Sequence, residues 1–301
     1  MAKAKLVIEQ VSEEQYQGQA TRRPLYRRLE KLLGLPVISF FTSFVYPVML
    51  EDNDADMLEG VLQKCGLPKG FALLVSSPGG SALAAERVIN ICHSYSGTGH
   101  YTVVVPAKAK SAATMICLGA SKIIMGKTSE LGTVDPQMVV EENGKVRWFS
   151  LHTLVKSYEA LFAKAVKEKG NLEPYIQQLA KYDSREIAEF RSALSLSKDI
   201  AVKSLKSGML KGLSEKDIEK KIQIFLTPER AKVHGRPIYG KEAKECGLDV
   251  ETRNVKDEMW SLVYELYVRL NNYVSRNNVA KCIESVDSSF RAMVPKAEGP
   301  E

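Results

Sequence analysis

The chain has 301 residues, of which 45% are hydrophobic and 26% are charged, with a net charge of +6. These values are close to the average for soluble globular proteins, and the sequence contains neither an internal repeat of fixed period nor a low-complexity tract, which excludes repeat and low-complexity proteins. The length is sufficient for one large α/β domain or two smaller ones with a substantial core.

Basic residues gather near the N-terminus, in the stretch TRRPLYRRLEK that begins at Thr21. Clustered positive charge can contact nucleic acid or anionic lipid. No nucleic-acid-binding module accompanies it, so we prefer the interpretation of a solvated helix face and do not expect a nucleic-acid partner. Residues 1–36 are therefore predicted to form a basic, helical arm.

The apolar run from Leu35 to Leu50 follows these basic residues and imitates a signal anchor. It is shorter than the ~20 residues that a membrane-spanning helix needs. It also contains Pro36 and Pro47 and begins too late for a secretion signal. We expect buried strands and a turn here, and no transmembrane segment.

From Val37 onward, strand patterns and helix patterns alternate. The strand-like segments are PVISFFTSF, GFALLVSSPGG, YTVVVPAKAK and SKIIMGKTSELG. The helix-like segments between them are EDNDADMLEGVLQKCG, SALAAERVINICHSY and SAATMICLGA. This alternation indicates βαβ units and a mainly parallel sheet.

After Gly132 the pattern changes to long helices. The predicted helices are LHTLVKSYEALFAKAVKEK, DSREIAEFRSALSLSKDIAVKSLKSG and SEKDIEKKIQIF. GRPIYGKEAKECGLDV then predicts a turn, a short helix and a strand, and residues 255–286 are predicted to be helical, followed by a frayed tail. The predicted division is an arm at 1–36, a domain at 37–252, and a C-terminal helical segment at 253–301.

The C-terminal helix has an aromatic and apolar face. Its residues are Trp260, Tyr264, Tyr267 and Leu270. Contacts between subunits and packing onto the core are equally good interpretations of this face.

Five cysteines are scattered along the chain and never form a CxxC pair: Cys65, Cys92, Cys117, Cys246 and Cys282. Several have apolar neighbours, so they are interpreted as reduced, packed thiols of a cytosolic protein rather than as metal ligands.

Two turns between a strand and a helix carry residues suited to acyl transfer, which needs a nucleophile, N–H donors and a base. Gly79 and Gly80 end one predicted strand, where the backbone can approach a substrate closely. Ser111 lies where another predicted strand gives way to a helix, and the amide of Ala112 follows it. Such turns fall at the carboxyl ends of parallel strands, where ligands bind. The structural alternative is an ordinary Pro-Gly-Gly turn and a serine that begins a helix.

Four blocks occur in a fixed order: LLVSSPGGSALAAERV, VVVPAKAKSAATMICLGASKIIM, ELGTVDPQ and HGRPIYGKEAKECGLDV. They resemble the Clp/crotonase-fold serine peptidases, and most closely the serine dehydrogenase proteinase family, which is related to signal peptide peptidase A and the Clp protease catalytic subunit. The resemblance spans roughly residues 37–250 and implies a spiral of ββα units, a site in a cleft and an oligomer. It implies that Ser111 is the nucleophile, with Gly79, Gly80 and Ala112 around the oxyanion. The last block contributes residues expected to be structural: Gly235, Arg236, Ala243, Gly247 and Leu248.

The base does not follow directly from this resemblance. The Clp subunit has a histidine where this chain has Asp135, and a carboxylate with a pKa of about 3.9 is a poor base for a serine hydroxyl. The signal peptide peptidase branch uses a lysine some forty to fifty residues after its serine, and Lys156 follows Ser111 by 45 residues. A desolvated lysine can act as a base, although helical periodicity places Lys156 opposite an apolar stripe, where a solvated lysine is the alternative. His234 and His152 are second-tier candidates, and Asp135 is assigned to orienting the site or to the substrate loop.

The sequence therefore predicts a cytoplasmic, homo-oligomeric serine peptidase that acts on peptides or proteins and needs no cofactor or metal. No GxxxxGK[ST] phosphate loop occurs, so energy-dependent unfolding would require a separate partner. Two alternatives stay open. One is a crotonase-like enzyme that binds acyl-CoA thioesters with the same pair of amides. The other is a scaffold that lacks a competent base, or a hydrolase that needs an activating partner.

Overall fold

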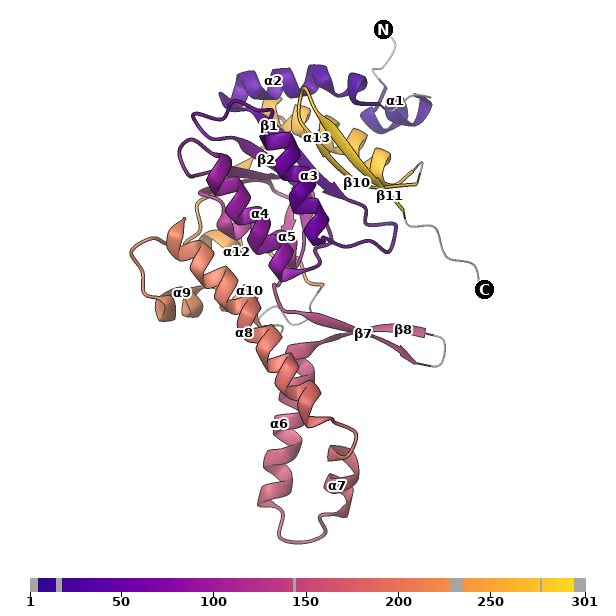
Figure 1. Cartoon of the computed structure of the whole chain (residues 1–301), viewed down its shortest axis with the longest axis vertical. Helices are drawn as coiled ribbons and strands as arrows, with labels where there is room; N and C mark the ends of the chain where they lie inside the picture. Colours follow the sequence, from indigo (N-terminus) through magenta and orange to yellow (C-terminus); the bar gives the residue numbers. More distant parts are fainter. Residues whose placement is uncertain (1–4, 15–17, 143–144, 228–234, 277, 295–301) are drawn as a thin grey trace.

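The computed structural model describes residues 5–14, 18–142, 145–227, 235–276 and 278–294. Within these residues a seven-stranded sheet has the order β11-β10-β1-β2-β3-β5-β9 (Figure 1). The strands are β1 Val37–Thr42, β2 Ala72–Ser76, β3 Thr102–Val105, β5 Lys122–Gly126, β9 Val250–Arg253, β10 Val279–Glu284 and β11 Ser289–Met293. The first five pair in parallel, whereas β10 and β11 are antiparallel. The predicted α/β class with a mainly parallel sheet is confirmed.

Helices cover both faces of this sheet. One face packs against α3 Asp52–Leu62, α4 Ala82–Tyr95 and α5 Ala112–Gly119, and the other against α2 Arg23–Leu33 and α13 Glu258–Val274. Successive strand residues point to opposite faces, so Phe40 and Leu73 join the first core while their neighbours Phe41 and Leu74 join the second. The continuous apolar runs of the sequence are therefore explained by burial on both sides.

Short extended segments form a second ladder beyond the carboxyl ends of the parallel strands. Its strands, β4 Lys108–Ala109 and β6 Glu130–Leu131, pair in parallel. Isolated bridges extend the ladder from Leu50 to Gly80, from Ser77 to Ala109, and from Leu131 to Ile238. Each unit thus contributes a long strand, a short extended segment and a helix, and the ladder brings the turn at Gly80 next to the turn at Ser111.

A hairpin and a helical arm project from this body (Figure 1). The hairpin is β7 Gln137–Glu142 and β8 Lys145–Ser150, and the arm consists of α6 Leu151–Lys167, α7 Glu173–Leu179 and α8 Ser184–Ser207. Helix α8 returns to the body, where it contacts α4 and α5. The remaining helical elements are α1 Val7–Glu13, the 3-10 turn η1 Gln19–Thr21, α9 Glu215–Lys221, α10 Gln223–Leu226 and α12 Gly240–Glu245.

Two sequence predictions are wrong. The helix predicted over 255–286 ends at Val274, and its last part forms β10 instead. Asn278 has a φ of 56°, a left-handed conformation that asparagine tolerates and that a continuing helix does not allow. The apolar run 35–50 yields one buried strand, β1, and then an exposed loop in which Val45 is 68% exposed, rather than several buried strands. The predicted frayed tail at 295–301 lies outside the described residues.

The aromatic face of α13 packs onto the core. Trp260 and Leu270 are buried there and Tyr267 is partly buried against it, whereas Tyr264 is exposed. Packing thus accounts for most of this face. Among the helices that the structure describes, none has the length and apolar character needed to cross a membrane.

Candidate active site

Ser111 occupies the turn that joins β4 to α5 in a strained conformation. Its backbone has φ 49° and ψ −121°, and it is one of two residues other than glycine with positive φ in the described part of the chain. Such a conformation costs roughly 1–3 kcal/mol and is typical of functional sites. Although Ser111 stands at the N-cap position of α5, its side chain makes no capping hydrogen bond. The helix-start alternative therefore does not account for this serine.

Gly79 and Gly80 lie immediately beside this turn. A Cβ atom on Gly79 would lie 2.5 Å from the carbonyl oxygen of Lys110 and 2.8 Å from the Cβ of Ser111. A Cβ atom on Gly80 would lie 2.3 Å from the carbonyl oxygen of Leu50. At both positions the neighbouring backbone leaves no room for a side chain, which explains why two glycines occur here.

Two amide groups at the site remain available. Within the described residues, neither the N–H of Gly80 nor the N–H of Ala112 donates a hydrogen bond to another protein group. The N–H of Gly79 is already used, since it donates to Oγ of Ser77 at 3.1 Å. Ala112 is the first residue of α5, where the helix dipole adds partial positive charge. This pair of amides beside Ser111 has the composition of an oxyanion hole.

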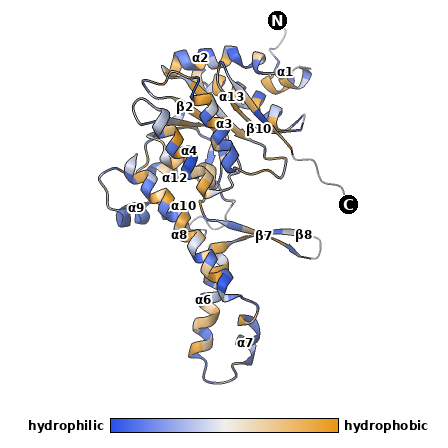
Figure 2. Ribbon diagram, in the orientation of Figure 1, coloured by the Kyte–Doolittle hydropathy of each residue, from blue (hydrophilic) through white to orange (hydrophobic). Residues whose placement is uncertain are grey.

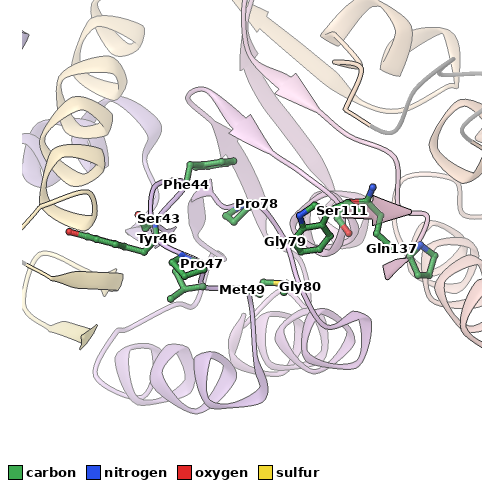
Figure 3. A pocket seen from close by; sticks show the side chains of 13 residues that line it. Ser43, Phe44, Tyr46, Pro47, Met49, Pro78, Gly79, Gly80, Ser111 and Gln137 are labelled. Carbon is green, nitrogen blue, oxygen red and sulfur yellow. Dashed lines mark hydrogen bonds between the residues drawn. The ribbon is translucent and has the colours of Figure 1, made fainter. Parts of the chain in front are cut away.

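Ser111 lines a cavity of about 490 Å³, shown in Figure 3. Its lining comes from the loop after β1, from the SPGG turn and from the hairpin: Ser43, Phe44, Tyr46, Pro47, Val48, Met49, Pro78, Gly79, Gly80, Pro136, Gln137 and Trp148. Phe44, Met49 and Trp148 are 41%, 44% and 53% exposed, so they offer apolar surface to a ligand. Gly80, Ser111 and Pro136 also line a smaller neighbouring cavity of about 250 Å³.

The loop and hairpin residues of this cavity are not predicted from the sequence. The loop 43–49 was predicted to be buried, and no strand was predicted over 137–150. A signal for the hairpin was present, because Asn-Gly at 143–144 between two β-rich runs is typical of a two-residue hairpin turn. No pattern in the sequence indicates that Trp148 and Phe44 lie near Ser111.

The two base candidates on α6, Lys156 and His152, line neither of the cavities that contain Ser111. Lys156 is exposed on α6, and together with His152 it lines another cavity, of about 280 Å³. Consecutive residues of α8 line the two cavities, Leu194 that of Lys156 and Ala193 the smaller Ser111 cavity. Asp135 is buried between Val134 and Pro136, which both line the smaller Ser111 cavity. His234 lies outside the described residues.

Lys110, the residue before Ser111, forms an ion pair with Glu130. Nζ of Lys110 lies 2.8 Å from Oε2 of Glu130 and donates to the carbonyl oxygen of Leu131 at 3.2 Å. Both partners belong to β6, so these contacts fix the turn before Ser111 against the second ladder. We assign Lys110 a structural role.

The chain is similar in sequence to a known protein family and to two relatives from one organism. A family model described as ClpP-like SDH-type serine proteinase matches residues 17–148. The uncharacterized protein MJ0137 of Methanocaldococcus jannaschii is 32% identical over 237 residues, covering 78% of this chain and 68% of the relative. The uncharacterized protein MJ1495 of the same organism is 28% identical over 236 residues, covering 78% of this chain and 66% of the relative. The chain thus spans about two thirds of these relatives.

Among solved structures, a membrane-bound stomatin-specific protease, 1510-N, is similar over 73% of this chain and 93% of its own. It was solved as a lysine-to-alanine mutant in complex with a substrate peptide. The TM-score is 0.29 and the sequence identity is 15%.

Proposed function

Because the chain belongs to the ClpP-like SDH-type serine proteinase family, we propose that it is a serine peptidase that forms an acyl-enzyme at Ser111. Oγ of Ser111 attacks the carbonyl carbon of a peptide bond and transfers its proton to a base. The base returns the proton to the leaving amine, and water then hydrolyses the ester. The observation that supports this proposal best is the strained Ser111 beside two amides without hydrogen-bond partners among the described residues.

The N–H groups of Gly80 and Ala112 would stabilise the oxyanion that develops during attack. Donors that are already in place need no reorganisation at the moment of reaction, and one such donor is worth about 10²–10³ in rate. Gly79 would act by leaving space, because its own amide is bonded to Ser77.

Lys156 is our first candidate for the base, with His152 and His234 as alternatives and Asp135 as an orienting residue. The proposal requires α6 to move toward the serine. Its first residue, Leu151, donates to the carbonyl oxygen of Pro136, which lines the Ser111 cavity, so the helix begins at the site. A peptide bound against the hairpin would therefore contact the end of β8 and the start of α6, which meet at Leu151.

A catalytically silent scaffold, or a hydrolase that awaits an activating partner, is the second candidate. The observation that favours it is that Oγ of Ser111 has no hydrogen-bonded base among the described residues. Binding of a partner protein that persists in Ser111→Ala, without turnover by the unmodified protein, would support this candidate.

The test is labelling by a fluorophosphonate probe, located by mass spectrometry. We expect labelling at Ser111 that is lost in Ser111→Ala and strongly slowed in one of Lys156→Ala, His152→Ala or His234→Ala. Lys164→Ala is the matched control, since Lys164 is an exposed lysine on the same helix that lies farther from its start at Leu151 and does not line the cavity of Lys156 and His152. Absence of labelling at any pH in the folded protein would contradict the proposed peptidase activity. The scaffold and the crotonase-like thioester enzyme would then be the alternatives.

We also propose that the protein acts as a homo-oligomer in a reducing, cytoplasmic compartment. All five cysteines are free, and four of them are buried. Unpaired, buried thiols are typical of proteins in reducing compartments. The projecting arm exposes apolar side chains that a second subunit would cover, including Phe162 and Val166.

A further inference from the structure

We infer that Lys281 is a positioning residue for the oxyanion hole, an inference that rests on the proposed function. Lys281 belongs to β10 and lines neither cavity that contains Ser111. Its backbone and its side chain together nevertheless connect the two ends of the loop 43–49, which we call the cavity loop. The far end of that loop determines where Gly80 lies.

Lys281 contacts the chain on both sides of the cavity loop. In the antiparallel register it lies opposite Thr42, the last residue of β1 before the loop. Its Nζ atom donates to Oδ2 of Asp54 at 2.9 Å and lies 3.5 Å from Oε2 of Glu51. Glu51 and Asp54 follow the loop after Leu50. Lys281 therefore holds the near end of the loop through backbone pairing and the far end through its ammonium group.

Leu50 passes this restraint to the oxyanion hole. It lies between the cavity loop and Glu51, and its N–H donates to the carbonyl oxygen of Gly79 at 2.8 Å. Its own carbonyl accepts from the N–H of Ser81 at 2.9 Å. The backbone contact between Leu50 and Gly80 leaves no room for a Cβ atom. A displacement of Leu50 would therefore displace the amide of Gly80 as well.

The charges explain why this restraint depends on a cation. Asp54 is 1% exposed, and its Oδ2 atom accepts from both Lys281 and the N–H of Glu51. Its Oδ1 atom has no hydrogen-bond partner among the described residues. Burial raises the pKa of Asp54 above its usual range, which reflects the cost of holding this carboxyl out of water. Without Lys281 the carboxylate would be buried and uncompensated, and the start of α3 would shift toward water.

The experiment compares Lys281→Met with Glu284→Gln. Glu284 is a matched control, because it lies on the same strand and is also buried but pairs with Arg22 of the N-terminal region instead. For Lys281→Met we expect fluorophosphonate labelling of Ser111 to slow by about 10- to 100-fold, the effect of a misplaced donor. Hydrogen exchange at residues 79–81 should become faster. In Glu284→Gln the labelling rate should stay within about twofold of the unmodified protein, even though the fold is less stable.

A double variant, Lys281→Met with Asp54→Asn, separates positioning from folding. It leaves no uncompensated buried charge, so it should fold while labelling remains slow and exchange remains fast. Wild-type labelling and wild-type exchange in the double variant would overturn the inference. If Ser111 is not labelled in the unmodified protein, the proposed function fails, and exchange at residues 79–81 still decides the role of Lys281: unchanged exchange in both variants overturns it.

Discussion

Arg22 and Glu284 form a fully buried ion pair that attaches the N-terminal region to β10. The guanidinium donates from Nε and Nη2 to the two carboxylate oxygens at 2.8 and 2.6 Å, and the two side chains are 1% and 0% exposed. Glu284→Gln would leave a buried guanidinium without its counter-charge, so we expect a loss of about 3–5 kcal/mol in the free energy of unfolding. Urea denaturation measures this loss. The double variant Arg22→Met, Glu284→Leu should recover most of it, and an unchanged midpoint in Glu284→Gln would contradict the prediction.

Adding a single Cβ atom at Gly80 tests whether the amide of this residue belongs to the oxyanion hole. Gly80→Ala places a Cβ atom 2.3 Å from the carbonyl oxygen of Leu50, a distance that forces the backbone to move. We expect labelling of Ser111 to fall by about 10²-fold or more, as after loss of an oxyanion donor. Gly66→Ala is the matched control, because a Cβ atom there meets no atom within 4 Å. Equal labelling rates in the two folded variants would refute a role for the Gly80 amide.

The cysteines give a prediction about pH. Burial raises the pKa of the Cys92 and Cys117 thiols far above the usual range, and it raises the pKa of the half-buried Cys65 thiol as well. Only the thiolate is alkylated, and a raised pKa lowers the thiolate fraction at pH 8. Iodoacetamide should therefore modify Cys65 first, at a rate that increases with pH, while Cys92 and Cys117 react only after unfolding. Mass spectrometry of tryptic peptides distinguishes these sites, and rapid modification of Cys117 in the folded protein would contradict the prediction.

At the scale of elements, the hairpin contributes one wall of the proposed substrate cavity. Trp148 of β8 lines the cavity and is 53% exposed, so it is available to pack against a bound peptide. We expect Trp148→Ala to raise KM about 10-fold or more while changing kcat less, because it removes uniform binding. Any fluorogenic peptide that the unmodified protein cleaves will serve. Val166→Ala on the arm is the control, and a fall in kcat at constant KM would instead place Trp148 in the chemical step.

The elements differ in how well the sequence predicts them, for physical reasons. The central strands follow from continuous hydrophobic runs, which are typical of strands buried on both faces. Helices α3 to α5 follow from helical spacing, which is a local pattern. β10 was missed because VAKCIE is short, directly follows a long helix, and becomes a strand only through pairing with β1. The same limit applies to the site. Ser111 and the glycines follow from local turns, whereas the contributions of Trp148 and Lys281 depend on contacts between segments far apart in sequence.

The projecting arm exposes several large apolar side chains. Helices α6, α7 and the first half of α8 extend beyond the body, and Figure 2 shows hydrophobic residues along α6 in this arm. Phe162, Val166 and Ile176 are 52%, 70% and 55% exposed. Only Leu151 and Val155 of α6 are buried and no residue of α7 is, so the exposed apolar side chains here favour contact with a second subunit.

We therefore expect the size of the proposed oligomer to depend on the arm, and the stability of the body not to depend on it. Phe162→Asp with Val166→Asp places two charges on the exposed apolar side chains of α6, far from the sheet and its two cores. We expect light scattering coupled to size exclusion to report a smaller species, with a melting temperature within a few degrees of the unmodified protein. Because α6 also carries Lys156, loss of Ser111 labelling in this smaller species would indicate that subunit contact brings the base to the serine. Unchanged oligomer size would exclude the arm as the contact, whatever the labelling rate.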